Sequence, residues 1–471
     1  MRGTAWFTGE YALRAARAAA AAGGIALLHS HPGARSWQSA ADGSADAETE
    51  RKIANLAREI TGLPLVGLTL STGSQTWSAR CWNQGSGTSV SRTDAESVRV
   101  LGDALRLAYH PHLRPPPSPQ PTQSRTVHSW GDEVQAHLAR LRILVVGAGS
   151  VGQLILEMLA RTGVESVGVM DFDSVEVINL DRLHGASVLD AYLRISKAEL
   201  GHRVMTRAAT AAQFSPHCHE ISVCEPHGLR AALDYDVIFC CVDRPWPRHV
   251  LNTIAYADVI PVIDGGVRLE PGPGGLRNAY WRSHIAGPAQ TCIRCVGQYD
   301  EADVQLERDG SLDNPTYIAN LPADSPLRVR QNVYATSLAA ASALTNQFLS
   351  LVVAPSGFGD PGPLRYDLRH HRVEPVNAVC HAQCSFSGHL GAGDARMDPT
   401  GVHLADRDAI SLRRREQART GARIARRVVR VADNVQQRLV PLLRRTPSRA
   451  RGAVPPRHGD PAPSADASAR R

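Results

Sequence analysis

Residues 143 to 182 read ILVVGAGSVGQLILEMLARTGVESVGVMDFDSVEVINLDR, and this stretch decides the fold of the chain. An apolar run ends in a glycine turn, a helical pattern follows, and a second apolar run ends at Asp171. This order is typical of a nucleotide-binding βαβ unit, in which glycines let the backbone approach phosphate and the helix N-terminus attracts an anion. Asp171 is placed to accept hydrogen bonds from a ribose. The glycines of the turn are Gly147, Gly149 and Gly152.

Polar residues beyond Asp171 favour ATP over the dinucleotide that a glycine fingerprint alone would indicate. The pattern D-x-D-x-V-x-x-x-N-L-x-R includes Asp173, Asn179 and Arg182. A triphosphate needs cations and a metal ion where the pyrophosphate of NAD needs mostly backbone. Arg182 and Lys197 can neutralise the charge that develops as pyrophosphate leaves, and Asn179 can hydrogen-bond a phosphate oxygen.

This pattern resembles the ThiF/MoeB/HesA adenylyltransferases, relatives of the ubiquitin-activating enzymes, over about Arg125 to Ser387. The resemblance implies a Rossmann-like α/β domain that uses ATP to adenylate the C-terminal glycine of a ubiquitin-like or sulfur-carrier protein. It implies catalytic roles for Arg182 and Lys197, and a homodimer. Asp243 ends the apolar run 237–242, at the sheet edge where such folds bind ligands, and by resemblance it is the Mg²⁺ carboxylate.

The chain departs from the family pattern in three places, one of which is Leu183 after Arg182, where the family commonly has glutamine. The family often has two arginines, three apart, ahead of the first strand, and here the pair is Arg125 and His128. Asp243 is followed by Arg244 rather than the usual asparagine. By resemblance, residues 260–267 form a strand and glycine turn near the adenylation site, and residues 332–351 form a long helix.

Four of the nine cysteines form two spaced pairs, C-x-x-C and C-x-x-x-C. Two such pairs suit a closed, tetrahedral, structural zinc site, and a similar arrangement occurs in the resembled family. The ligands are Cys292, Cys295, Cys380 and Cys384. Residues 296–330, where ubiquitin-activating enzymes carry a thioester cysteine, contain none, so the adenylate is the expected product. Cys218 and Cys224 remain candidate nucleophiles.

The N-terminal part carries a second metal motif. Residues 26–42 read ALLHSHPGARSWQSAAD, and H-x-H-P-x₆-S-x-x-D resembles the JAMM/MPN (JAB) metallopeptidase motif. The resemblance implies a zinc ion held by His29, His31 and Asp42, with Ser39 stabilising an oxyanion. The glutamate base expected on an earlier strand is missing. Either the chain begins too late or the peptidase is degenerate, and we expect little isopeptidase activity.

These motifs predict the domain organisation. A small α/β JAB/MPN domain spans residues 1–109, a proline-rich linker spans 110–124, and the ThiF-type domain with its four-cysteine zinc knuckle spans 125–395. A basic tail spans 396–471, with 17 arginines and 6 acidic residues from Gly401 onward and a helical pattern from Ile410 to Val440. An acidic partner, nucleic acid or an anionic membrane surface would each suit this tail, and so would a role as a solubilising segment.

The composition of the chain fits a protein of the cytoplasm. The N-terminus has no signal-peptide pattern, and no apolar run of membrane-spanning length stands out. Three functions remain open: activation of a ubiquitin-like or sulfur-carrier protein with ATP, Mg²⁺ and Zn²⁺; adenylation of a non-protein carboxylate such as a modified tRNA base; and a non-catalytic binding scaffold.

Overall fold

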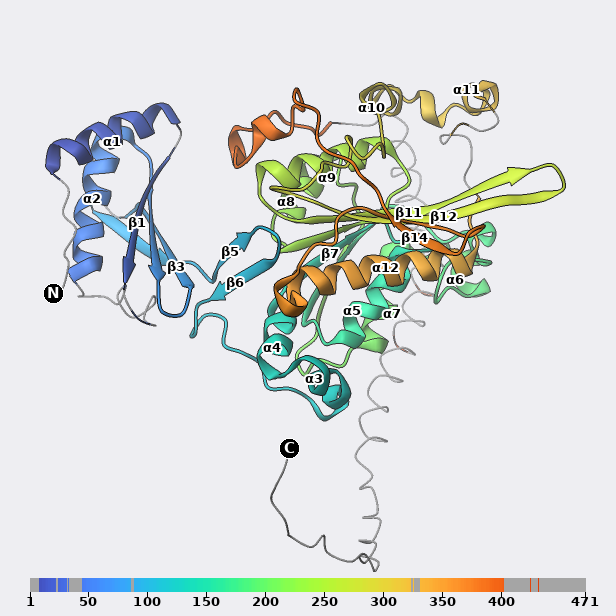
Figure 1. The fold of residues 1–471 in the computed structure, drawn as a ribbon, viewed down its shortest axis with the longest axis horizontal. Helices are drawn as coiled ribbons and strands as arrows, with labels where there is room; N and C mark the ends of the chain where they lie inside the picture. The colour runs from blue at the N-terminus through green and yellow to red at the C-terminus, as the bar shows by residue number, and fades with distance from the viewer. Residues whose placement is uncertain are drawn as a thin grey trace, which may run out of the picture. The chain divides into compact units, whose positions relative to one another are not determined.

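The computed structural model describes residues 8–22, 24–31, 33, 45–85, 89–322, 325, 331–401, 424 and 431 (Figure 1). They form an N-terminal α/β part, a two-stranded hairpin and a large α/β part. The helix expected from Ile410 to Val440 lies outside the described residues, apart from Ile424 and Val431. Ser39 and Asp42 also lie outside them.

An eight-stranded sheet forms the centre of the large part. Its strands are β7 (Arg142–Val146), β8 (Ser166–Met170), β9 (Ser215–His219), β10 (Val237–Cys240), β11 (Val262–Gly272), β12 (Gly275–Ala286), β13 (Leu364–Asp367) and β14 (Arg372–Pro375). They lie in the order β14-β13-β12-β11-β10-β7-β8-β9. The strands from β11 to β9 pair in parallel, and β12, β13 and β14 add antiparallel pairs. This is the Rossmann-like α/β fold expected from the sequence.

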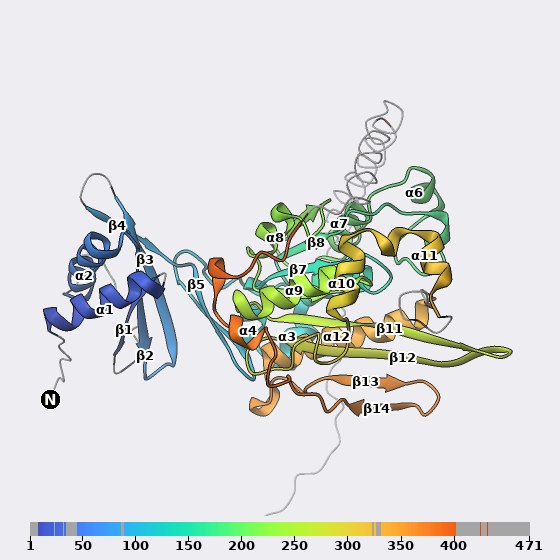
Figure 2. The ribbon, with the colours of Figure 1, turned by 90° about the horizontal axis from the view of Figure 1, so that it is seen from above.

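Helices cover both faces of this sheet, and β7 shows why its sequence is continuously apolar. Ile143 and Val145 are buried against α5 (Gly152–Thr162), α7 (Lys197–Ala208) and α12 (Tyr334–Val353). Leu144 and Val146 are buried in the opposite core, with α8 (Pro226–Ala232) and α9 (Pro245–Ala257). Parallel strands buried on both faces need apolar residues at every position. Figures 1 and 2 show the two helical layers.

Shorter helices complete the large part. They are α3 (Ser124–Trp130), α4 (Asp132–Arg140), α6 (Val188–Tyr192), α10 (Glu301–Arg308) and α11 (Pro315–Asn320).

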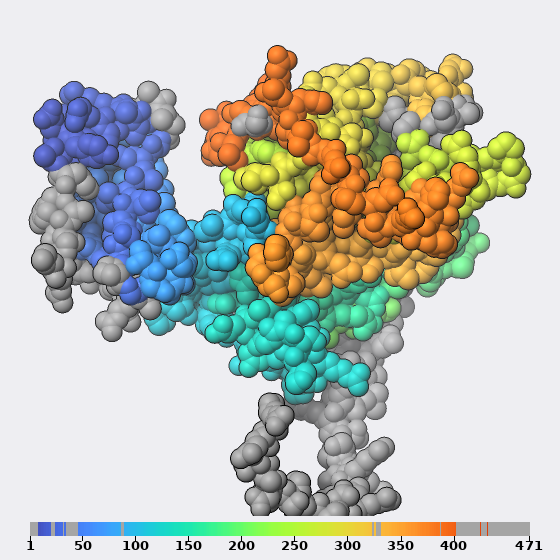
Figure 3. All heavy atoms as spheres, in the orientation of Figure 1, coloured from blue at the N-terminus to red at the C-terminus, as the bar shows by residue number. Residues whose placement is uncertain are grey.

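Helix α12 is long and apolar enough to cross a membrane by length and composition, contrary to the expectation that no such run exists. Half of its apolar window is buried, and Ala340, Leu344 and Phe348 are fully buried in the core. A core helix of a globular domain has these properties, and we interpret α12 as one. Figure 3 shows atoms of α12 and of the segment after it, both orange, on the surface of the large part that is turned toward the viewer.

The N-terminal part contains a four-stranded sheet and two helices. The elements are α1 (Gly9–Ala22), β1 (Ile25–His31), α2 (Ala45–Thr61), β2 (Leu65–Ser71), β3 (Thr76–Gln84) and β4 (Val90–Asp94). β1 pairs in parallel with β2, and β2, β3 and β4 continue antiparallel. Helices α1 and α2 thus flank β1 in the chain, and β2 follows α2.

A hairpin of β5 (Ser97–Leu101) and β6 (Leu105–Tyr109) packs into the core of the large part. Leu105 and Leu107 are buried there, and Arg99 donates to main-chain oxygens of Asp236 and Val259. The expected boundary at residue 109 stays a prediction. The hairpin is stabilised by its contacts with the core of the large part, although it precedes the proline-rich linker.

Candidate active site

A cavity of about 970 Å³ opens at the carboxyl ends of the parallel strands of the large sheet. Ligands bind at this edge in open α/β sheets. The sequence-predicted residues gather around this one cavity. Those in its lining are Gly147, Gly149, Asp171, Asp173, Asn179, Arg182, Lys197 and Asp243.

The glycine turn after β7 is too tight for side chains at two positions. Gly147 has φ +92°, and a Cβ there would lie 2.6 Å from the carbonyl oxygen of Cys241. A Cβ on Gly152 would lie 1.9 Å from the carbonyl oxygen of Gly147. Glycine therefore closes the turn and directs the N-terminus of α5 toward the cavity, where its free N–H groups can bind phosphate. Gly149 has open space beside it.

Asp171 holds the loop after β8. Its carboxylate accepts hydrogen bonds from the backbone N–H of Ala148 and of Asp173, both at 2.7 Å. Burial raises the pKa of Asp171 to about 6, with the charge of Asp173 adding to the effect and Lys197 opposing it. Each carboxylate oxygen has a second lone pair, so Asp171 can still accept from a ribose.

Lys197 is the ammonium group of the site, and the chain contains only one other lysine, Lys52, among 52 basic residues. Its Nζ lies 2.9 Å from Oδ2 of Asp173. Burial alone would lower the pKa of Lys197, but the carboxylates of Asp171, Asp173 and Asp243 outweigh it and raise the pKa. Lys197 is therefore charged and faces the cavity.

Arg182 and Asn179 lie on the segment after Asp173. Nη1 of Arg182 donates to the Ile178 carbonyl and to the Asp181 carboxylate, at 2.7 and 2.8 Å. Oδ1 of Asn179 accepts a hydrogen bond from the backbone N–H of Glu176. This bond uses the oxygen of the Asn179 side chain and not its NH₂ group. Both side chains can then offer donors to an anion in the cavity.

Asp243 follows β10 and is exposed in the cavity. Its charge raises the pKa values of Lys197 and of Arg248, so it lies within electrostatic reach of both. A carboxylate at this position fits Mg²⁺, which proteins bind through one or two carboxylates together with substrate phosphates. Arg244, in place of the usual asparagine, donates to Oδ1 of Asp313 at 2.7 Å and ties the segment after α10 to this edge.

The sequence analysis did not identify three charged residues at this edge of the cavity, Arg248, Asp264 and Arg282. Arg248 donates to Oδ1 of Asp264 at 3.2 Å, and Nε of Arg282 lies 4.0 Å from Oδ2 of the same carboxylate. A signal was present, since an aspartate inside the apolar strand IPVID is unusual. Its partners lie on α9 and β12, which sequence spacing does not connect.

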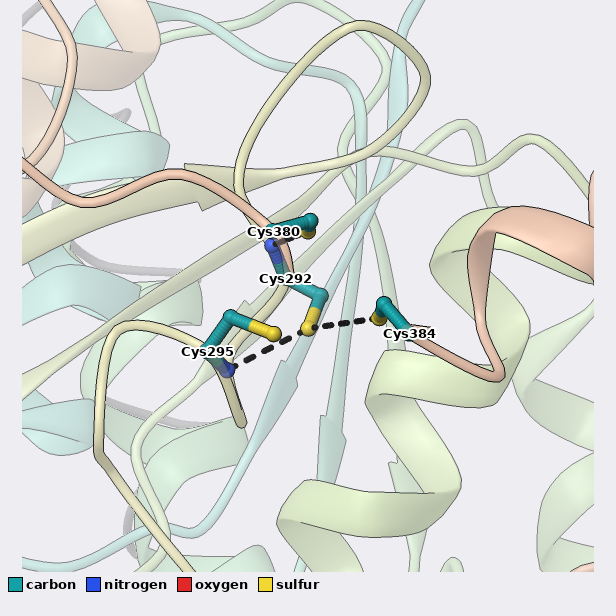
Figure 4. Close-up of side chains that lie close together, drawn as sticks. All are labelled: Cys292, Cys295, Cys380 and Cys384. Atoms are coloured by element: carbon teal, nitrogen blue, oxygen red, sulfur yellow. Dashed lines mark hydrogen bonds between the residues drawn. The ribbon is translucent and has the colours of Figure 1, made fainter. Parts of the chain in front are cut away.

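The four cysteines expected to bind zinc converge (Figure 4). Their sulfurs lie within 4.8 Å of one another, and the sulfurs of Cys292 and Cys384 are 3.7 Å apart. Tetrahedral zinc with Zn–S bonds of about 2.3 Å separates its sulfurs by about 3.8 Å. The donor set and spacing therefore fit a zinc ion held by Cys292, Cys295, Cys380 and Cys384.

The cysteine nearest the nucleotide loop is a poor nucleophile. Cys241 lines the cavity, but burial and the charge of Asp264 raise the pKa of its thiol well above the ordinary range. A thiolate is the reactive form. Cys224 is buried at the cavity wall, and Cys218 is exposed on β9.

A smaller cluster lies at the end of β1. Nε2 of His31 lies 3.0 Å from Oδ2 of Asp46, and the rings of His29 and His31 are 5.1 Å apart. His31 Nε2 is buried and has no hydrogen bond of acceptable geometry within the described residues. An imidazole nitrogen that makes no hydrogen bond and lies beside a carboxylate and a second imidazole fits a metal ligand set. Burial lowers the pKa of His29, which favours the neutral ligand form.

Glu50, the other carboxylate near these histidines, is already engaged. It is 1% exposed, pairs with Arg80 through both oxygens, and accepts from Nε1 of Trp82 at 3.0 Å. A Cβ on Gly67 would collide with it. A carboxylate held by these donors is poorly placed to take a proton from water.

Comparison with known proteins identifies the large part. The model of the ThiF family matches residues 122–380. The chain belongs to the ThiF family. The ThiF resemblance drawn from the residues after Asp171 is thereby confirmed, whereas the JAMM/MPN assignment of the N-terminal part stays a prediction.

Curated relatives of this ThiF chain are adenylyltransferase-sulfurtransferases. The chain is 31% identical over 171 residues to adenylyltransferase and sulfurtransferase uba4 of Ogataea parapolymorpha, and this alignment covers 36% of the chain and 41% of that protein. It is 30% identical over 168 residues to MOCS3 of Xenopus laevis, covering 35% and 34%. The alignments with these two relatives thus cover less than half of either relative. The E. coli MccB structure with AMPCPP and SeMet MccA aligns with a TM-score of 0.43 and 14% identity, over 57% of this chain and 74% of that one.

Proposed function

We propose that this ThiF-family chain uses ATP to adenylate the C-terminal glycine carboxylate of a ubiquitin-like or sulfur-carrier protein. The observation that carries the proposal is the meeting of Lys197, Asp173 and Asp243 with the glycine turn around one cavity. The relatives named adenylyltransferase and sulfurtransferase support the same chemistry.

In the proposed reaction, a carboxylate oxygen of the substrate attacks the α-phosphorus of ATP. The new P–O bond gives the acyl-adenylate, and the bond to the β-phosphate oxygen breaks to release pyrophosphate. Lys197 and Arg182 stabilise the charge that grows on the departing phosphates. Asp171 orients the ribose, Asn179 holds a phosphate oxygen, and the N–H groups of α5 bind phosphate.

Asp243 would hold Mg²⁺, which when bound neutralises phosphate charge. The four cysteines would hold a structural zinc ion, which fixes the segment after β12 to the segment near residue 380. We propose that the product leaving this site is the adenylate, because residues 296–330 contain no cysteine and Cys241 is a poor nucleophile.

We propose that the N-terminal part is a JAMM-like metal domain with impaired hydrolysis, which processes or releases the carrier protein slowly if at all. His29 and His31 would bind zinc with one carboxylate. By resemblance to the motif this carboxylate is that of Asp42, which lies outside the described residues. The carboxylate in contact with His31 is that of Asp46. Ser39 would stabilise an oxyanion.

A homodimer is part of the proposal, and an exposed apolar surface supports it. Five large apolar side chains between residues 177 and 192 are 55–76% exposed, and exposed apolar patches often mark interfaces between proteins. They are Val177, Ile178, Val188, Leu189 and Tyr192. We also propose a cytoplasmic location, with the basic tail contacting an acidic partner, nucleic acid or an anionic membrane.

Exchange of labelled pyrophosphate into ATP tests the proposal. We expect exchange that requires a small protein ending in Gly-Gly with a free carboxylate. Exchange that instead requires tRNA would support the alternative of a non-protein carboxylate, which the basic tail favours. Absence of exchange with either substrate class would support a scaffold and overturn the proposed activity.

A further inference from the structure

Ser150 lies in the glycine turn after β7 and lines the active-site cavity. The turn offers donors to an anion, because the backbone N–H groups of Gly149 and Ser150 make no hydrogen bond to another residue of the described chain. A Cβ on Gly149 would meet no atom within 4 Å, so there is open space beside the turn. The side chain of Ser150 adds a hydroxyl group to these backbone donors.

A hydrogen bond from a distant part of the chain holds this hydroxyl group. Nδ2 of Asn332 donates to Oγ of Ser150 at 2.6 Å, although the two residues are 182 positions apart in the sequence. Asn332 lies just before α12 and lines the same cavity. Helices α5 and α12 pack against each other in the large part (Figure 1). The bond therefore joins the glycine turn at the start of α5 to the start of α12.

A second hydrogen bond determines which end of the Asn332 amide faces Ser150. Oγ of Ser337 donates to Oδ1 of Asn332 at 2.8 Å, and Ser337 is fully buried in α12. Because this donor occupies Oδ1, the NH₂ group of Asn332 is the end that faces Ser150. A hydroxyl group has one hydrogen and two lone pairs. Since Ser150 accepts from Asn332, its own hydrogen is left for another acceptor.

The surroundings of Ser150 favour a phosphate oxygen as that acceptor. Within the described residues, Oγ of Ser150 makes no hydrogen bond besides the one from Asn332. Its neighbours in the turn are N–H donors, and the charged Lys197 lines the same cavity. Phosphate oxygens accept hydrogen bonds, and those from charged or well-oriented donors are the strongest. Backbone, hydroxyl and ammonium donors around one space therefore suit the phosphates of a nucleotide.

We propose that Asn332 is a positioning residue for ATP, which orients the hydroxyl group of Ser150 so that it donates a hydrogen bond to a phosphate. Ser337 holds the Asn332 amide in turn, so the donors follow one another from the core of α12 to the nucleotide. This inference rests on the proposed function and adds a nucleotide contact that is controlled from α12.

Equilibrium binding of ATP, with Mg²⁺ and without a carrier protein, tests the contact made by Ser150. We expect Ser150→Ala to raise the Kd for ATP by about 10-fold or more, while kcat of pyrophosphate exchange at saturating ATP stays near that of the wild type. Thr336→Ala is the matched control, because Thr336 lies beside Ser337 in α12 and its hydroxyl group donates to the Val333 carbonyl. An unchanged Kd in Ser150→Ala overturns the phosphate contact.

The double variant Ser150→Ala/Asn332→Ala separates positioning from a purely structural role. If Asn332 acts through Ser150, Asn332→Ala raises the Kd for ATP by itself but adds nothing to Ser150→Ala. Effects that multiply in the double variant, or a wild-type Kd in Asn332→Ala, overturn the positioning role. If Asn332→Ala does not fold, Ser337→Ala takes its place with the same expectation.

The same measurements distinguish failure of this inference from failure of the proposed function. Wild-type protein that binds ATP but shows no exchange with a Gly-Gly-ended protein contradicts the proposed function, and the Kd values of the variants still decide the role of Asn332. Wild-type protein that binds no ATP overturns both.

Discussion

Lys197 is bound twice to Asp173: its Nζ donates to Oδ2 at 2.9 Å, and its backbone N–H donates to the carbonyl oxygen at 2.8 Å. The two contacts join the start of α7 to the loop after β8. They hold the ammonium group in the cavity before any nucleotide binds. Electrostatic stabilisation of this kind is most effective when the charge is already in place.

Lys197→Met should therefore lower the rate of adenylation with little effect on folding. We expect kcat to fall by roughly 10²–10³-fold, the range seen when a preorganised charge donor is removed. Lys52→Met is a fitting control, because Lys52 is the other lysine of the chain and its side chain is 73% exposed. Pyrophosphate exchange measures both variants, and equal activity of the two would show that Lys197 does not act on phosphate.

Zinc content should reach two ions per chain, one at each metal site. Cys380→Ser should remove the ion of the four-cysteine site, and His31→Ala should remove the ion of the N-terminal site. Each single variant should therefore keep one ion, because the ligand sets share no residue. Elemental analysis of purified protein measures this, with exposed Cys218→Ser as a control that keeps both ions. A Cys380→Ser protein with undiminished zinc would contradict the assignment.

Leu105→Ala should destabilise the large part, although residue 105 precedes the proline-rich segment. Leu105 is 1% exposed and belongs to the same core as Ile143 and Phe239. Burial of this kind predicts a loss of about 2–5 kcal/mol in the free energy of unfolding. Leu276→Ala is the control, since Leu276 is 54% exposed. Unfolding by denaturant, monitored as the loss of pyrophosphate exchange, distinguishes Leu105→Ala from Leu276→Ala.

His137 should make stability depend on pH. Burial, assisted by the nearby charge of Arg140, lowers the pKa of His137 to about 4 in the folded protein. Between about pH 4 and 6.5 the unfolded chain binds the proton more readily, so this contribution to stability is full above pH 6.5 and is lost as pH falls toward 4. We expect the unfolding midpoint to fall less between pH 7 and 5 in His137→Gln than in the wild type. An identical fall in both proteins would contradict this.

Sequence reasoning succeeded where local patterns decide the structure. The buried run of β7, the tight glycine turn and the acidic residue after β8 each follow from spacing alone. It failed where partners come from distant elements. Arg248, Asp264 and Arg282 meet from α9, β11 and β12, and Asp46 meets His31 from the helix after β1. The core role of Leu105 was hidden because prolines after residue 114 are typical of a linker.

The central claim is that this site adenylates a polypeptide carboxylate, and Asp243→Ala tests it most directly. Pyrophosphate exchange is measured with a Gly-Gly-ended ubiquitin-like protein, and Asp132→Ala, a change of an exposed residue at the start of α4, is the control. We predict that Asp243→Ala abolishes exchange while its zinc content and folding stay unchanged, and that Asp132→Ala retains wild-type exchange. Exchange by Asp243→Ala at a near wild-type rate would contradict the assignment of this cavity as the adenylation site.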